Sequence, residues 1–177
     1  MDKLKYLENS VRHIPGFPKP GILFHDITTL LKDGKAFKIA VDEIVARYKN
    51  KKIDKVVGVE SRGFILGSVV AYKLGVGFVL ARKKGKLPCD TISVTYKLEY
   101  GTDTLEIHKD ALSANERILI VDDLIATGGT VAGVVELVEK FKVKIVGLAF
   151  VIELPDLKGR DKIKGYPVTS LIKFHGE

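Results

Sequence analysis

The chain has 177 residues, a hydrophobic content of 46% and a formal net charge of +7. This length and apolar content predict a single globular domain over residues 1–177. No apolar run approaches the roughly eighteen residues of a transmembrane helix, and no signal-peptide core is visible, so we expect no membrane partner. Cys89 is the single cysteine, which excludes an intrachain disulfide framework and predicts a cytoplasmic location.

The positive charge predicts an anionic partner, which leaves open a phosphorylated small molecule, a nucleic acid or a membrane surface. Nucleic-acid readers usually carry a basic helix face or exposed aromatic side chains among their positive charges. Here Lys and Arg are scattered along the chain, so we expect no nucleic-acid partner. The densest basic cluster is "ARKKGK", residues 81–86, and a solvated turn is an alternative interpretation of it.

The first half of the chain predicts two helices that alternate with two strands. After a short N-terminal helix, the prolines and glycines of His13–Gly21 predict an irregular but stiff segment. Apolar residues spaced three and four apart predict a helix over 34–50. A short apolar run at 55–60 predicts a strand, residues 61–75 a buried helix, and 77–83 a second strand.

The second half predicts a hairpin followed by another strand, helix and strand. Apolar and polar side chains alternate within residues 91–112 on both sides of Gly101, which is typical of an antiparallel hairpin with a polar tip. Residues 116–123 form a nearly continuous apolar run, the pattern of a strand covered on both faces. A helix follows the next loop, and 144–154 supply another strand. The repeated strand, helix, strand order predicts an α/β fold with an open, mainly parallel sheet and helices on both faces.

Polar loops follow three of these strands. Ligands of such sheets bind at the carboxyl ends of the strands. We therefore expect the loops Glu60–Gly63, Ala81–Lys86 and Asp122–Thr130 to converge on one crevice.

The loop Leu124–Thr130 has the composition of a phosphate-binding turn. Its small residues let several backbone N–H groups turn toward one point, and the following helix contributes its positive N-terminal end. The hydroxyls of Thr127 and Thr130 can also donate. Neither a Walker loop nor a dinucleotide-binding fingerprint is present. The alternative is an ordinary turn in which Thr130 caps the helix.

Asp122 and Asp123 stand at the mouth of this loop, where they would repel a phosphate. Carboxylates are useful there if they accept hydrogen bonds from the vicinal hydroxyls of a sugar, or if they neighbour a cation. A ribose 5-phosphate unit satisfies the acids and the loop together.

The stretch "LIVDDLIATGGT" resembles the phosphoribosyl pyrophosphate (PRPP) motif of the phosphoribosyltransferases. The segments "FPKPGILFHDIT", "ESRGFILG", "RKKGKLP" and "YKLEYGTDTLEIHKDAL" resemble, in order, segments of the adenine phosphoribosyltransferase family. The resemblance extends from about Ile14 to the end of the chain. It implies a type I phosphoribosyltransferase fold with an antiparallel flexible hairpin and an N-terminal base-binding hood over about residues 1–33. It also implies a Mg²⁺-dependent homodimer that makes AMP and pyrophosphate from adenine and PRPP in purine salvage.

The same resemblance assigns roles to individual residues. The ribose hydroxyls would be held by Asp122 and Asp123, and the 5-phosphate by Ala126, Thr127, Gly128, Gly129 and Thr130. Pyrophosphate would be bound by Glu60, Ser61, Arg62, Arg82, Lys83 and Lys86, with one basic residue possible from a partner subunit. A cis peptide is expected at Glu60–Ser61.

Adenine would lie against Leu23 and Phe24, and the catalytic residues would be Glu99, which handles the purine proton, and Arg62. Phe24 is equally compatible with a place in the core. The family often has Arg where this chain has His25, so no contact to the base is assigned to His25. Few protein carboxylates need to touch Mg²⁺, because PRPP brings its own oxygen ligands, and we expect no dedicated metal cluster.

Two other functions remain open from the sequence. One is phosphoribosyl transfer to a 6-oxopurine, against which the match of "PGILFHDI" to the adenine segment argues. The other is a regulatory protein that senses PRPP on the same fold.

Overall fold

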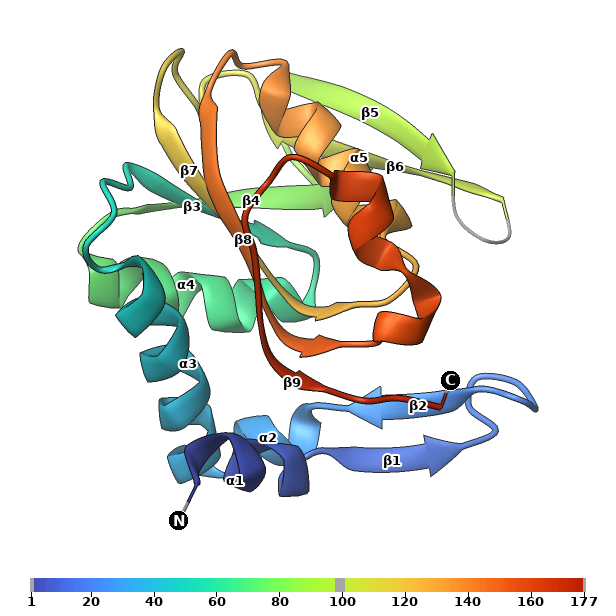
Figure 1. Cartoon of the computed structure of the whole chain (residues 1–177). Coiled ribbons are helices and arrows are strands. Elements are labelled where there is room, and N and C mark those ends of the chain that lie inside the picture. Colours follow the sequence, from blue (N-terminus) through green and yellow to red (C-terminus); the bar gives the residue numbers. More distant parts are fainter. Residues whose placement is uncertain (1, 98–100, 177) are drawn as a thin grey trace.

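The computed structural model describes residues 2–97 and 101–176, and a twisted sheet runs through its centre (Figure 1). The seven strands of this sheet lie in the order β5-β6-β4-β3-β7-β8-β9. Their bounds are β3 Lys55–Val59, β4 Gly77–Lys83, β5 Thr91–Lys97, β6 Thr102–His108, β7 Arg117–Ile125, β8 Lys144–Glu153 and β9 Val168–Lys173. Strands β4, β3, β7, β8 and β9 are parallel, and the β5–β6 hairpin joins antiparallel to β4. The fold is therefore the mainly parallel α/β sheet with an antiparallel hairpin that the sequence predicts.

A second, two-stranded sheet lies at the N-terminal end of the chain. It pairs β1 (Arg12–Pro15) with β2 (Leu23–Asp26). The prediction of an irregular segment over His13–Gly21 is thus wrong for its first three residues, which belong to β1. Pro15 is tolerated there because it is the last residue of a strand in a two-stranded sheet.

Helices cover both faces of the large sheet. Their bounds are α1 Lys3–Asn9, α2 Thr28–Lys32, α3 Gly34–Tyr48, α4 Arg62–Leu74 and α5 Gly129–Glu139, with 3₁₀ turns η1 Pro155–Leu157 and η2 Gly159–Ile163. The predicted helices over 34–50 and 61–75 are confirmed as α3 and α4. No helix within residues 2–97 and 101–176 has the length and apolar character needed to cross a bilayer.

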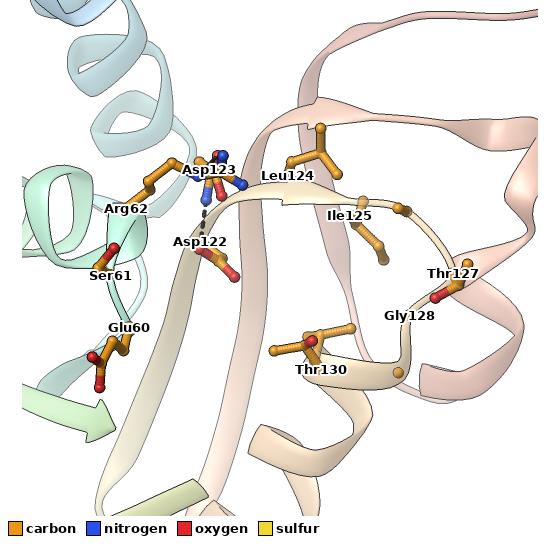
Figure 2. A pocket seen from close by; sticks show the side chains of 13 residues that line it. Glu60, Ser61, Arg62, Asp122, Asp123, Leu124, Ile125, Thr127, Gly128 and Thr130 are labelled. Carbon is orange, nitrogen blue, oxygen red and sulfur yellow. Dashed lines mark hydrogen bonds and ion pairs between the residues drawn. The ribbon is translucent and has the colours of Figure 1, made fainter. Parts of the chain in front are cut away.

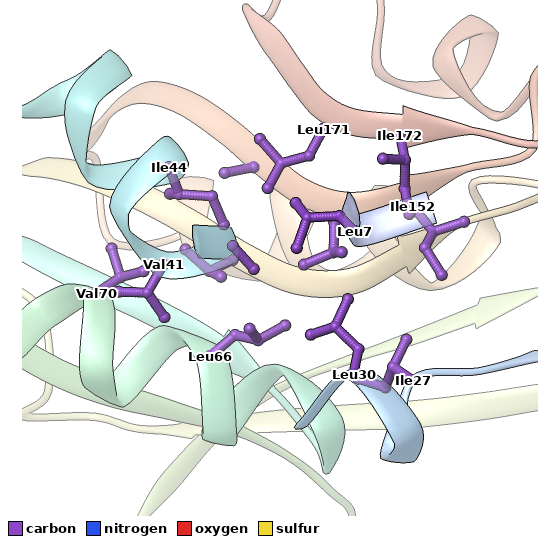
Figure 3. Close-up of a cluster of buried hydrophobic side chains, with 14 of the residues drawn as sticks. Leu7, Ile27, Leu30, Val41, Ile44, Leu66, Val70, Ile152, Leu171 and Ile172 are labelled. Carbon is purple, nitrogen blue, oxygen red and sulfur yellow. The ribbon is translucent and has the colours of Figure 1, made fainter. Parts of the chain in front are cut away.

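Two hydrophobic clusters, one on each face of the sheet, hold the helices in place. One packs α1, α2, α3 and α4 against the sheet through side chains such as Leu30, Ile44 and Leu66 (Figure 3). The other packs α5 against the opposite face. Successive residues of β7 alternate between the clusters: Leu119 joins the first and Ile120 the second, and both are fully buried.

Strand β7 is longer than its sequence predicts. The prediction ends at Asp123, whereas the strand continues to Ile125, because Leu124 and Ile125 pair with Ile152 and Glu153 of β8. The loop before α5 is therefore shorter, and the carboxylates of Asp122 and Asp123 are mounted on a strand.

The central strand β3 packs closely against Phe78 of β4. A side-chain carbon placed on Gly58 would lie 2.5 Å from Phe78 Cζ and 3.0 Å from the carbonyl oxygen of Gly63. Gly58 is therefore required by the approach of the aromatic ring and of the first turn of α4.

We expect Gly58→Ala to lower the free energy of unfolding by about 1–3 kcal/mol, because the added methyl group overpacks this contact. Denaturant unfolding measures the loss, and Gly34→Ala is the matched control, since nothing lies within 4 Å of a carbon added there. The loss caused by Gly58→Ala should shrink in a Phe78→Leu background. Equal stabilities for the Gly58 and Gly34 variants would contradict the packing argument.

Candidate active site

A pocket of about 240 Å³ opens where the carboxyl ends of β3 and β7 lie side by side. From β3 the chain passes through α4 to β4 on one side, and from β7 through α5 to β8 on the other. The pocket is therefore at the point where the strand order reverses, the usual ligand site of such sheets. Its lining consists of Glu60, Ser61, Arg62, Asp122, Asp123, Leu124, Ile125, Ala126, Thr127, Gly128, Gly129, Thr130 and Val131 (Figure 2).

Two helices begin at this pocket, one from each face of the sheet. Helix α4 starts at Arg62 and α5 at Gly129. Within the described chain, neither helix start is capped by a side-chain hydrogen bond. The interpretation of Thr130 as a helix cap is therefore wrong, because the cap position is Gly128. Two sets of N–H groups, each with the positive end of a helix dipole, are available to anions.

The loop between β7 and α5 is held from behind by η2. A side-chain carbon on Gly128 would lie 2.3 Å from the carbonyl oxygen of Gly159, and one on Gly159 would lie 2.2 Å from the carbonyl oxygen of Ala126. Gly128 also has a φ of 75°. The two glycines thus allow backbone to pack directly on backbone, which fixes the path of the loop.

Asp122 and Asp123 lie between the two helix starts. The carboxylate of Asp122 accepts a hydrogen bond of 2.9 Å from the backbone N–H of Asp123. Asp123 is 3% exposed, and its Oδ2 lies 2.7 Å from Nε of Arg62. Burial and the charge of Asp123 raise the pKa of Asp122 well above its ordinary value. Burial also raises the pKa of Asp123, although the Arg62 guanidinium opposes that shift.

Arg62 connects the carboxylates to the N-terminal sheet. While Nε contacts Asp123, its Cζ lies 5.6 Å from the centre of the Phe24 ring. Phe24 is half-buried and meets Phe17 edge to face at 5.1 Å. Phe24 is thus not part of either buried cluster. Its contact with Arg62, which lines the pocket, places Phe24 at the pocket's edge. Leu23, the preceding residue on β2, is also half-buried.

His25 lies in a different environment from Phe24. It is 3% exposed and stacks on Phe174 with 4.6 Å between ring centres and 5° between planes. Its Nδ1 lies 2.9 Å from Nδ1 of His13. These contacts give His25 a place in the packing of β1 and β2 against the C-terminal end of the chain.

The basic end of β4 contacts the pocket through Glu60; Arg82 and Lys83 pair with β6, so the loop expected over Ala81–Lys86 begins only after Lys83. Arg82 Nε lies 3.2 Å from Glu60 Oε2, which also accepts a hydrogen bond from the N–H of Lys83. Burial raises the pKa of Glu60, but these two donors more than compensate and hold it below its ordinary value. The side chain of Lys83 pairs with Asp103 at 3.1 Å, and Lys86 is exposed. The structure thus brings together Glu60, Ser61 and Arg62, and leaves Arg82, Lys83 and Lys86 outside the pocket lining.

The expected cis peptide at Glu60–Ser61 is present and confirms that prediction. Glu99 lies outside the described residues. The carbonyl oxygen of Lys97, two residues earlier, lies 3.0 Å from the position of a side-chain carbon on Gly129. Lys97, the last residue of β5, therefore lies beside Gly129, the first residue of α5.

The pocket includes residues to which the sequence assigned no role. Leu124, Ile125 and Val131 line it, and Gly159 supports the loop from behind. Their apolar or small side chains are indistinguishable in sequence from those of the core. Among the described residues, no group of three His, Cys, Asp or Glu side chains is placed to hold a metal ion.

Known proteins are similar to this chain in both sequence and fold. A model of the phosphoribosyl transferase domain matches residues 28–176. Adenine phosphoribosyltransferase from Clostridium kluyveri is 58% identical over 168 residues, which cover 95% of this chain and 98% of that protein. The crystal structure of adenine phosphoribosyltransferase from Thermoanaerobacter pseudethanolicus is 49% identical with a TM-score of 0.94, covering 97% of this chain and 99% of that one.

A third similar structure was solved with a ligand. It is the Giardia lamblia adenine phosphoribosyltransferase complexed with 9-deazaadenine, which is 39% identical with a TM-score of 0.93 and covers 99% of this chain and 100% of that one. The chain therefore belongs to the phosphoribosyltransferase family, and within that family to the adenine phosphoribosyltransferases.

Proposed function

We propose that this pocket is where the chain carries out the reaction of its family, the transfer of the 5-phosphoribosyl group from PRPP to adenine. The N9–C1′ bond forms, the bond from C1′ to pyrophosphate breaks, the purine loses a proton, and the products are AMP and pyrophosphate. One observation carries the assignment to this pocket. A pair of carboxylates lies between two uncapped helix starts, which matches a ribose with a phosphate group at each end.

The loop before α5 would bind the 5-phosphate. We assign this role to Ala126, Thr127, Gly128, Gly129 and Thr130, through backbone N–H groups and the two hydroxyls. Asp122 and Asp123 would accept hydrogen bonds from the ribose hydroxyls. Support comes from their position on β7, immediately before the loop, so that both ends of one ribose 5-phosphate can be held at once.

The start of α4 would bind pyrophosphate. Ser61 and Arg62 line the pocket, α4 begins there without a side-chain cap, and Arg62 adds a positive charge. Charge that develops on the departing pyrophosphate would be stabilised by donors already in place, the usual source of electrostatic catalysis. Glu60 positions Arg82, and we propose that Arg82, Lys83 and Lys86 complete the site once the ligand is bound or a partner subunit is present.

The N-terminal part of the chain would form the adenine site. We propose a single domain over 1–177 in which residues 1–33 form a hood, with Leu23 and Phe24 against the purine. The ring of Phe24, half-buried beside Arg62, supports this assignment. Glu99 is proposed to handle the purine proton. Lys97, at the end of β5, supports this proposal, because its carbonyl oxygen lies beside Gly129, which lines the pocket.

Mg²⁺ fits this site if the substrate supplies most of its oxygen ligands. The described residues provide two neighbouring carboxylates and no larger set of ligands, and Mg²⁺ is typically held by one or two carboxylates together with substrate phosphates. We propose that it binds with PRPP, near Asp122 and Asp123, and offsets the charge of pyrophosphate.

We further propose a homodimer and a cytoplasmic location. Ile65 and Tyr72 are 44% and 85% exposed, and they lie seven residues apart on α4, on one side of the helix. Leu80 of β4 is 37% exposed. These apolar side chains support an interface between subunits. The location is supported by the single cysteine, which is exposed and unpaired in the described chain.

The reaction is tested by incubating the protein with PRPP, Mg²⁺ and each of adenine, hypoxanthine, guanine and xanthine. Only adenine should give a nucleotide, and a metal chelator should abolish its formation. Nucleotide formed from a 6-oxopurine would show a different base specificity. PRPP binding without any nucleotide would identify a sensor.

Asp122→Asn should weaken PRPP use and stabilise the fold. A charge-assisted hydrogen bond to ribose is lost, so we expect the KM for PRPP to rise about tenfold or more. Because the folded pKa of Asp122 is raised, the wild type loses stability as the pH rises from the ordinary Asp pKa through the raised one. Removing that carboxylate should therefore increase the free energy of unfolding at pH 7.

Denaturant unfolding at pH 7 and initial rates measure these two effects. The control is Asp110→Asn, which removes an exposed carboxylate outside the pocket. A less stable Asp122→Asn protein, or an unchanged KM for PRPP, would contradict the assignment.

Gly159→Ala tests whether η2 supports the phosphate loop. The added methyl group collides with the carbonyl of Ala126, so the loop must move. We expect the KM for PRPP to rise about tenfold, since displacements near 1 Å disturb bound geometry strongly. Gly34→Ala is the control, and equal KM values for the two variants would show that the loop does not depend on this contact.

A further inference from the structure

The segment after β8 runs along both the loop and α5. Its turn η2 contacts the loop through Gly159, and Ile163, 2% exposed, belongs to the cluster beneath α5. Arg160 donates two hydrogen bonds of 2.6 Å to the buried Glu153. Beyond η2, the hydroxyl of Tyr166 donates to Glu139 at the other end of α5. The backbone of η2 is thus anchored on both sides of Lys162.

Lys162 directs its amino group toward the start of α5. A side-chain carbon placed on Gly129 would lie 3.9 Å from Lys162 Nζ and 4.0 Å from Thr127 Oγ1. The amine therefore lies next to the loop that the proposed function assigns to the 5-phosphate. It comes from a segment more than thirty residues further along the chain, outside the "LIVDDLIATGGT" motif.

The amine of Lys162 lies beside a positive helix end and has no carboxylate partner in the described part of the chain. No carboxylate pairs with Lys162 among residues 2–97 and 101–176, whereas the neighbouring Arg160 pairs with Glu153 and Lys164 with Asp161. The amine lies beside Gly129, the first residue of α5, and this end of the helix is itself positive. A lysine beside a positive helix end is unfavourable without an anion, and favourable when a phosphate lies between the two.

We infer that Lys162 is a further binding residue for the 5-phosphate, which it would contact with a charge-assisted hydrogen bond. The inference rests on the proposed assignment of the loop Ala126–Thr130 to that phosphate. It divides recognition of one phosphate between backbone N–H groups from the motif and a side-chain cation from η2. Lys162 lies beside the loop before α5, whereas the proposed pyrophosphate end of the pocket is lined by Glu60, Ser61 and Arg62.

Calorimetric titration with ribose 5-phosphate and, separately, with pyrophosphate tests this inference. Lys162→Ala should weaken ribose 5-phosphate binding about three- to tenfold, the effect of losing one partly exposed charged contact. Its affinity for pyrophosphate should not change. Lys162→Arg should retain most of the affinity for ribose 5-phosphate.

The matched control is Lys164→Ala, which removes the same charge two residues away and should affect neither ligand. Equal ribose 5-phosphate affinities for the Lys162→Ala and Lys164→Ala variants would overturn the inference, as would an equal loss for both ligands. AMP synthesis by the wild type is measured alongside. If AMP forms and Lys162→Ala binds ribose 5-phosphate normally, only the role of Lys162 fails. If ribose 5-phosphate binds but no AMP forms, the proposed reaction fails and the binding test still stands.

Discussion

The pocket depends on two carboxylates that the fold keeps partly out of water. Burial raises the pKa of both Asp122 and Asp123, so their ionised forms cost folding free energy. That cost is offset in part by Arg62, which contacts Asp123 at 2.7 Å, and by the N–H of Asp123. The positive starts of α4 and α5 stand on either side. A ligand with hydroxyls at its centre and anions at both ends would complete every one of these interactions.

This arrangement requires the first turn of α4 to pack very close to β7. A side-chain carbon on Gly63 would lie 2.8 Å from Asp122 Oδ1 and 2.8 Å from the carbonyl oxygen of Val121. Glycine at this position lets the start of α4 approach β7, so that Arg62 reaches Asp123. The glycines at 63, 128 and 159 therefore share one role, since each allows backbone to approach the pocket or its loop where a side chain would prevent it.

The sequence predicted best those features that depend on neighbouring residues. Apolar spacing identified α3 and β4, and the contiguous stretch from Leu119 to Thr130 identified one wall of the pocket. The prediction placed the end of β7 too early because Leu124 and Ile125 are held by pairing with β8, about thirty residues away. Strand β9 and the support of the loop by η2 were not predicted for the same reason. Such contacts depend on tertiary packing, which local propensity does not encode.

The two halves of the proposed site differ in how they are assembled. The PRPP side comes mainly from two strand-to-helix junctions, so its geometry follows from the strand order. The adenine side is on β2, which is paired with β1 and lies near the C-terminal end of the chain (Figure 1). The ring of His25 stacks there on Phe174. The family model begins only at residue 28, after this sheet. In the proposed site, base recognition would therefore depend on contacts between the two ends of the chain, because His25, the neighbour of Phe24 on β2, packs on Phe174. Substitutions in this layer should consequently change the use of adenine more than that of PRPP.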